Sequence, residues 1–151
     1  VEIGLALKNV LAIASGISDG LGFGDNSRAA LITRGLKEII QLGLKVGGQM
    51  ETFMGLTGLG DLGVTCTSRH SRNRRLGELI GQGYAPQEAL KRVEMVAEGY
   101  YTAKNVEELE KNLNLELPIC REVYKILYEG KDPSAAVNDL MTRERKSEAI
   151  V

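Results

Sequence analysis

Apolar side chains recur at helical spacing along almost the whole chain, most clearly in its first two stretches. Ile3–Ala14 is apolar on every side except at Lys8 and Asn9, and a helix that is apolar all round is normally buried. A second helix is expected at 25–46, where Asp25 or the asparagine after it can cap its start. The glycine-rich segment between these helices predicts a turn, with four glycines: Gly16, Gly20, Gly22 and Gly24.

The rest of the chain predicts further helices, whose starts are marked by capping residues and prolines. The expected ranges are 51–54, 72–81 after a Ser71 cap, 86–93, 103–112 after a Thr102 cap, 119–129 behind Pro118, and 133–141. Only 62–67 and 95–96 resemble strands. Strands and helices do not alternate, so a nucleotide-binding sheet is not expected. We predict one all-α domain over residues 1–151.

Lys8 is the most informative residue of the first helix. Its neighbours three and four positions away carry no charge, and burying an ammonium is costly unless it is paired or loses its proton. A lysine held in this way can act as a general acid or base. The alternative is a structural lysine that reaches the surface at a helix end or pairs with a carboxylate.

The composition excludes several classes of function. The 151 residues are 43% hydrophobic and carry a net charge of −1, so no overall positive field attracts nucleic acid or an anionic membrane. No apolar run approaches the roughly 18 residues of a membrane span, and no signal peptide is recognisable. His70 is the sole histidine, so neither a metal site nor a triad built on histidines is expected.

The cysteines and the first residues bear on compartment and completeness. Cys66 and Cys120 lack the spacing of a metal or redox motif, which favours free, partly buried thiols in a reducing cytoplasm. The chain enters its first predicted helix almost at once and does not begin with methionine. We therefore expect a fragment of a longer polypeptide.

A loop in the middle of the chain carries the sequence GLGDLG at 58–63. It matches the GxGxxG pattern of dinucleotide-binding folds, but that pattern needs a strand before it and a helix after it. Here a short helix is expected before it, and the residues after it do not resemble a helix. We interpret the glycines as a tight backbone that brings the carboxylate of Asp61 close to a ligand.

Four arginines lie within the seven residues Arg69–Arg75, where a helix is predicted to begin. Basic side chains oppose the dipole at a helix N-terminus, whereas an anion is favoured there. A bound phosphate would resolve this conflict, with neutral hydrogen bonds from Ser71 and Asn73 beside an arginine fork. A solvated face and a nucleic-acid patch are alternatives, the latter less favoured because no aromatic residues interleave with the arginines.

These motifs occur together in a known family. LKN at 7–9, GLGDL at 58–62 and SRNRR at 71–75 resemble the C-terminal domain of bacterial NAD(P)-dependent glycerol-3-phosphate dehydrogenases, from Glu2 to about Met141. The resemblance implies a multi-helix domain like the C-terminal domain of 6-phosphogluconate dehydrogenase. It also implies reversible reduction of dihydroxyacetone phosphate to sn-glycerol 3-phosphate with NAD(H) or NADP(H), for glycerophospholipid synthesis.

The resemblance assigns roles on the substrate side. Lys8 corresponds to the lysine that donates and accepts the proton, and it also contacts substrate. Asp61 corresponds to an aspartate that binds substrate beside that lysine. Ser71, Arg72 and Asn73 correspond to residues that hold glycerol phosphate. Together they form half of an active site.

On the cofactor side, the resemblance assigns Arg72, Val96 and Glu98, the last two near the nicotinamide end. Asn9 and Thr65 correspond to lesser polar residues beside the substrate. No metal is expected. The family's N-terminal Rossmann domain, which holds most of the dinucleotide, is absent from this chain, so the 151 residues alone are expected to show little activity. The expected partner is that domain of the same polypeptide; assembly of identical chains is left open.

Two other interpretations stay open from the sequence. The chain could be the helical domain of another two-domain hydroxyacid or sugar-phosphate dehydrogenase, although SRNRR is not replaced by the motifs of those enzymes. It could also be a non-enzymatic helical module that binds anions or oligomerises around a structural lysine. The preference for NADH or NADPH is not encoded in this segment.

Overall fold

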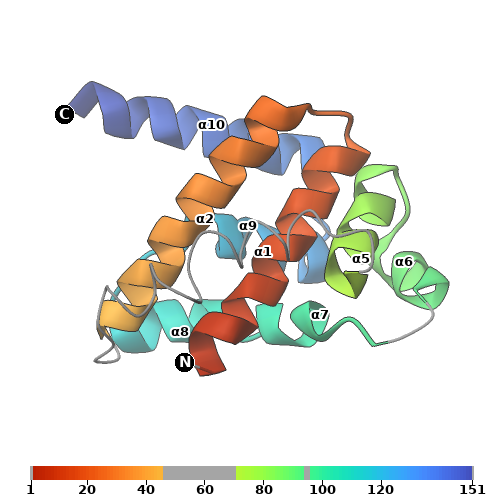
Figure 1. Cartoon of the computed structure of the whole chain (residues 1–151), viewed down its shortest axis with the longest axis horizontal. Helices are drawn as coiled ribbons and strands as arrows, with labels where there is room; N and C mark the ends of the chain where they lie inside the picture. The colour runs from red at the N-terminus through yellow and green to blue at the C-terminus, as the bar shows by residue number, and fades with distance from the viewer. Residues whose placement is uncertain (1, 46–70, 94–95, 151) are drawn as a thin grey trace.

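The computed structural model describes residues 2–45, 71–93 and 96–150, and every regular element in these ranges is an α-helix (Figure 1). This confirms the all-α prediction. None of these helices is long and apolar enough to cross a membrane. The helices are α1 (Glu2–Gly20), α2 (Asp25–Lys45), α5 (Arg72–Gly81), α6 (Pro86–Arg92), α7 (Glu98–Ala103), α8 (Val106–Leu113), α9 (Pro118–Tyr128) and α10 (Pro133–Ile150).

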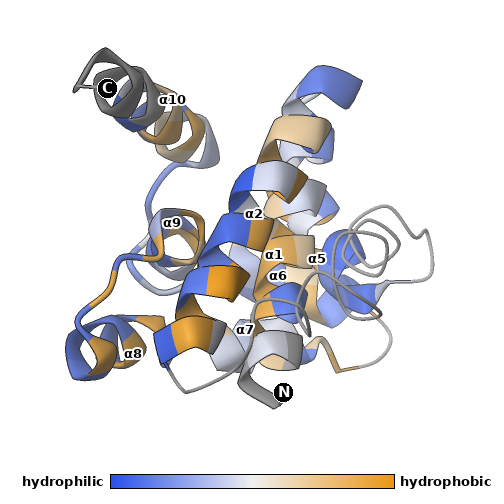
Figure 2. Cartoon of the chain, turned by 60° about the vertical axis from the view of Figure 1, so that its left-hand side comes forward, coloured by the Kyte–Doolittle hydropathy of each residue, from blue (hydrophilic) through white to orange (hydrophobic). Residues whose placement is uncertain are grey.

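The first helix, α1, forms the centre of the hydrophobic core. It packs against α2, α5, α7 and α9, and Leu7, Val10 and Ile13 are fully buried. Figure 2 shows apolar residues along α1 between α2 and α5. The prediction that the first helix is buried is therefore confirmed, because neighbours on several sides cover its apolar surface.

The turn predicted at Gly16 and Gly20 is wrong, because α1 continues through both glycines. Only the residues after α1 turn, and there Gly22 adopts a φ of +89°. A Cβ at Gly16 would lie 2.0 Å from the carbonyl oxygen of Arg74, and one at Gly20 would lie 2.2 Å from that of Glu78. These glycines therefore serve a close backbone approach between helices rather than a turn.

The partner helix α5 contributes a matching pair of glycines. A Cβ at Gly77 would lie 2.0 Å from the carbonyl oxygen of Ile13, and one at Gly81 would lie 2.4 Å from that of Ile17. In each pair of contacts, a step of four residues along α1 matches a step of four residues in the same direction along α5, so the two helices run parallel. When this register is continued by one helical turn towards the N-termini of both helices, Asn9 lies level with the first turn of α5.

Several predicted helix boundaries agree with the structure. The helix predicted at 72–81 is α5, and the side chain of Ser71 caps it by accepting a 3.2 Å hydrogen bond from the amide of Arg74. The predicted starts of α2, α6, α9 and α10 are also observed. Local capping chemistry and proline at a first helical position set these starts.

The helix predicted at 103–112 is observed as α8, which begins only at Val106, and its predicted start is wrong because a separate short helix, α7, ends at Ala103. Thr102 does not cap a helix. Its Oγ1 donates to the carbonyl of Glu98, 3.2 Å away, inside α7. The last helix also exceeds its predicted end at 141 and reaches Ile150. The predicted helix at 51–54 and the strand-like segment at 62–67 lie outside the described residues, and Val96 belongs to no strand.

Two buried carboxylates cap the N-terminus of α9. Glu38 of α2 accepts hydrogen bonds from the amides of Ile119 and Cys120, at 2.9 and 3.3 Å. Glu110 of α8 accepts one from the amide of Leu117, at 2.9 Å. The remaining residue of this turn is a proline, which has no amide proton to satisfy. The contacts tie α2 and α8 to α9.

Burial of Glu38 predicts a dependence of stability on pH. Desolvation raises the pKa of Glu38 from 4.5 to about 7, outweighing its amide hydrogen bonds. A carboxyl with a raised pKa in the folded state favours folding fully below its unfolded pKa and loses that contribution as pH rises through the folded pKa. We expect this group to remove about 3 kcal/mol of unfolding free energy between pH 4.5 and 7.

Urea unfolding at a series of pH values checks this expectation. The difference in unfolding free energy between the wild type and Glu38→Gln should change across that interval, because glutamine does not titrate. A difference that stays constant with pH would show that Glu38 has the same pKa in the folded and unfolded chains.

Candidate active site

Lys8 is buried within the core at the N-terminal half of α1. The residue is only 4% exposed, and the neighbours one turn along the helix, Leu11 and Ala12, are buried as well. The prediction of a buried lysine is confirmed. An ammonium in such surroundings is held away from bulk water, which strengthens its electrostatic interaction with any ligand that reaches it.

Three segments that are distant in sequence meet at Gly99 of α7. The amide of Gly99 donates a 2.8 Å hydrogen bond to Oδ1 of Asn73. A Cβ at Gly99 would lie 2.7 Å from the carbonyl oxygen of Asn9, the residue that follows Lys8. The structure thus brings together α1, the first turn of α5 and the first turn of α7, and each of these segments contains residues predicted to form the site.

The start of α5 presents hydrogen-bond donors. Ser71 accepts a helix-capping bond with Oγ, and its hydroxyl proton can still be donated. Asn73 accepts with Oδ1, which leaves the NH₂ group as its donor side. Arg72 is exposed and forms no ion pair with a described residue. The first turn of α5 contains no acidic residue, so it suits an anion.

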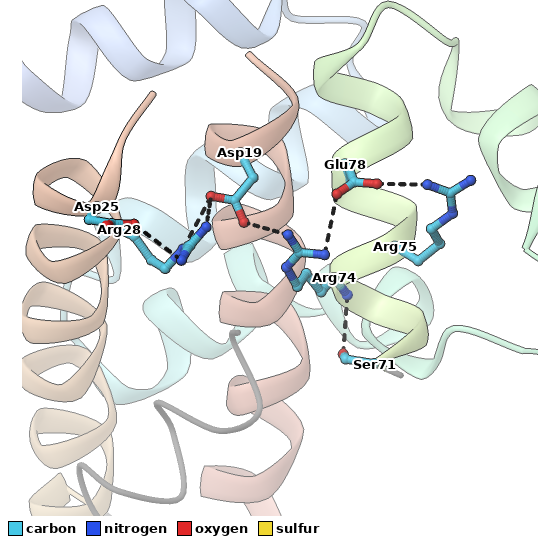
Figure 3. Close-up of polar contacts among 7 residues, drawn as sticks. All are labelled: Asp19, Asp25, Arg28, Ser71, Arg74, Arg75 and Glu78. Atoms are coloured by element: carbon cyan, nitrogen blue, oxygen red, sulfur yellow. Dashed lines mark hydrogen bonds and ion pairs between the residues drawn. The ribbon is translucent and has the colours of Figure 1, made fainter. Parts of the chain in front are cut away.

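The charges of two other arginines of the same motif are paired within the protein (Figure 3). Arg74 contacts Oδ2 of Asp19 at 2.9 Å and Oε2 of Glu78 at 3.3 Å. Arg75 contacts the other oxygen of Glu78 at 2.6 Å. The conflict between basic charge and the helix dipole is therefore relieved partly by these carboxylates. Among the described residues of the motif, Arg72 is the arginine best suited to a ligand.

The residues assigned to the cofactor lie beside Gly99. Val96 is 63% exposed, and Glu98, the first residue of α7, is exposed. Both side chains are therefore accessible to a ligand next to the junction of α1, α5 and α7.

Other predicted residues fall outside the described part of the chain. These are Asp61, Thr65, Cys66 and His70. Cys120 is fully buried, as its predicted place in the core requires. Desolvation and the neighbouring Glu38 raise the pKa of its thiol, so the thiolate is disfavoured and the side chain acts as a small apolar group. No cluster of metal-ligating side chains occurs in the described ranges.

A cavity of about 480 Å³ lies away from this junction, between α2, the start of α9 and α10. Its lining includes Arg34, Glu38 and Ile119 but none of the predicted site residues. The amides at the start of α9 already donate to carboxylates. This cavity therefore offers no free helix terminus for a phosphate.

Solved structures define the class of protein first. The crystal structure of glycerol-3-phosphate dehydrogenase from Coxiella burnetii superimposes on this chain with a TM-score of 0.89 and 47% identity, over 93% of this chain and 43% of that one. Glycerol-3-phosphate dehydrogenase from Plasmodium falciparum gives a TM-score of 0.77 and 26% identity, over 91% and 40%. The fold is that of a helical domain found in such oxidoreductases.

The family follows from sequence. A family model described as the C-terminus of NAD-dependent glycerol-3-phosphate dehydrogenase matches residues 1–138, and the chain belongs to this family. The glycerol-3-phosphate dehydrogenase [NAD(P)+] of Fusobacterium nucleatum is 58% identical over 98% of this chain and 44% of its own length. The protein of that name from Clostridium tetani is 55% identical over 98% and 42%. The chain thus spans less than half the length of these relatives.

Sequence reasoning missed two features that shape the site. The first is the contact of Gly99 with Asn9 and Asn73. The second is Asp19, which the predicted turn placed outside any helix. The available sequence signal concerned the packing of α1 against α5. Gly16 and Gly20 lie four residues apart, as do two glycines of α5, and such pairs of small residues allow helices to approach closely.

Proposed function

We propose that this chain is the substrate-binding and catalytic part of an enzyme that interconverts dihydroxyacetone phosphate and sn-glycerol 3-phosphate with NAD(H) or NADP(H). One observation carries the proposal. The parallel register of α1 and α5 sets an anion-suited helix start, with Arg72 and Asn73, level with the buried Lys8. Family membership and the names of the relatives support the choice of substrate.

In this proposal, the start of α5 holds the phosphate. Arg72 provides a planar fork of donors, and Ser71 and Asn73 add neutral hydrogen bonds. Phosphate bound there leaves the three-carbon part of the substrate to extend towards α1. Asp61, assigned from the resemblance, would bind the substrate beside Lys8.

Lys8 serves as the proton donor and acceptor in this proposal. During reduction it donates a proton to the carbonyl oxygen of the substrate, and during oxidation it accepts the proton of the alcohol. Its charge also polarises the carbonyl, which is effective because the group is shielded from water. The nicotinamide, when bound, supplies or receives the hydride. Val96, Glu98 and Arg72 are the residues of this chain that would contact that cofactor.

The whole activity requires more than this chain in our proposal. We place the main dinucleotide site in a Rossmann domain of the same polypeptide, consistent with relatives more than twice as long. The product would serve glycerophospholipid synthesis in the cytoplasm. We expect the isolated 151 residues to show little turnover.

The test uses the full-length polypeptide that carries this segment, assayed by oxidation of NADH and of NADPH with dihydroxyacetone phosphate. Arg72→Gln should raise the KM for this ketone about tenfold to a hundredfold, because a charge-assisted contact to phosphate is lost. The matched control is Arg75→Gln, since Arg75 belongs to the same motif but pairs with Glu78. Its KM should stay within about twofold of the wild type.

Two results would contradict the proposal. Failure of the wild-type enzyme to reduce dihydroxyacetone phosphate with either cofactor would contradict the proposed function itself. Equal KM values in the wild type and Arg72→Gln would leave the reaction but reject the start of α5 as its phosphate site.

A further inference from the structure

Asp19 joins three helices through charged contacts (Figure 3). Its Oδ1 accepts from Nη2 of Arg28 on α2 at 2.8 Å, and its Oδ2 accepts from Nη2 of Arg74 on α5 at 2.9 Å. The Asp19 side chain is only 7% exposed. A carboxylate in the last turn of a helix opposes the helix dipole, and its burial adds a desolvation cost. The two arginines offset both.

Arg74 carries this connection to the start of α5. It belongs to the first turn, directly after Arg72 and Asn73, and its guanidinium contacts Asp19 through Nη2 and Glu78 through Nη1. Its Nε is buried and has no hydrogen-bond partner among the described groups. The two Nη contacts therefore hold the side chain, and they direct it along α5 away from the proposed phosphate.

Contacts of several kinds hold the first turn of α5. The glycine contacts hold α5 against α1 from Arg74 onwards, and the hydrogen bond from Gly99 holds Asn73. The Asp19–Arg74 ion pair adds a side-chain contact between α1 and the first turn of α5. Since it is largely shielded from water, it is screened less than a surface pair.

We propose that Asp19 is a positioning residue for substrate phosphate: by holding Arg74, it fixes the first turn of α5 against α1 and so sets Arg72 and Asn73. This inference rests on the proposed function. Asp19 itself does not touch the substrate. Loss of its charge loosens the turn and frees Arg74 from one of its two partners, so binding of the phosphorylated substrate weakens more than turnover at saturation.

The test compares kinetic constants of the full-length enzyme and Asp19→Asn. We expect the KM for dihydroxyacetone phosphate to rise about tenfold, with kcat within about threefold of the wild type. Damage that is only structural would lower the fraction of active enzyme, and hence kcat, without changing KM. Thermal unfolding of each variant, recorded in parallel, measures that damage directly.

Asp25→Asn is the matched control, because Asp25 pairs with the same Arg28 at 3.5 Å but is 97% exposed and does not contact Arg74. Its KM should equal that of the wild type. Asp19→Glu, which keeps the charge, should recover part of the lost affinity. Arg74→Lys keeps the positive charge but cannot contact both carboxylates as a fork does, so it should reproduce the rise in KM.

Several outcomes overturn the inference. An unchanged KM in Asp19→Asn would do so, as would a loss confined to kcat. If Asp19→Asn does not fold, Arg74→Lys decides, and a wild-type KM in that variant would reject the positioning role. These results differ from failure of the proposed function, which appears as a wild-type enzyme unable to reduce the ketone.

Discussion

Replacement of Lys8 by methionine in the full-length enzyme is expected to lower kcat for dihydroxyacetone phosphate about a hundredfold to ten-thousandfold, the usual range for loss of a general acid. Lys8 is buried, so truncation to alanine would also leave a cavity and confuse the result. Methionine has a similar length and an apolar tip. It fills the same space and removes only the ionisable group.

Thermal unfolding of Lys8→Met, recorded in parallel, separates loss of the proton donor from any loss of stability. Lys37→Met on α2 is the control, because Lys37 is exposed and distant in sequence from the junction at Gly99. Its kcat should be unaffected. A Lys8→Met enzyme with the turnover of the wild type would reject Lys8 as the proton donor.

Gly77→Ala is expected to destabilise the chain by about 3 kcal/mol, which for a protein of this size lowers the unfolding temperature by about 10 °C. The added Cβ would lie 2.0 Å from the carbonyl oxygen of Ile13, so the backbones of α1 and α5 must separate. On an isolated helix the same substitution would be stabilising by about 1 kcal/mol. The sign of the effect therefore reports the helix contact.

Gly24→Ala provides the comparison. Gly24 precedes α2, has no atom within 4 Å of an added Cβ and does not have a positive φ. We expect a neutral or slightly stabilising change, because alanine restricts the unfolded chain. Calorimetry or circular dichroism on both variants checks the pair. A Gly77→Ala protein as stable as Gly24→Ala would show that the two helix backbones do not touch.

The features that sequence reasoning predicted correctly are encoded locally. The buried first helix follows from an apolar pattern that leaves no polar face, and Lys8 was identified because it interrupts that pattern. The start of α5 follows from a single side chain, Ser71, which caps it. In each case a few neighbouring residues contain the whole signal.

The features that were missed depend on distant partners. Gly16 and Gly20 resemble turn residues until α5 is placed against them. Thr102 resembles a helix cap, but it lies inside α7, near the point where Gly99 packs against Asn9 and Asn73. The ion pair of Asp19 joins residues 55 positions apart. The residues next to each position do not decide these cases, because the deciding contacts form only after the helices pack.

The glycine contact between α1 and α5 has a consequence for substrate range. Because backbone meets backbone there, this contact holds no side chain that could be exchanged for a smaller one, and replacing one of its glycines would separate Lys8 from the first turn of α5 at a cost in stability. Variants that accept longer or shorter phosphorylated ketones should therefore arise from changes elsewhere around the proposed substrate site. The contact between the two helices therefore fixes the separation between Lys8 and the first turn of α5.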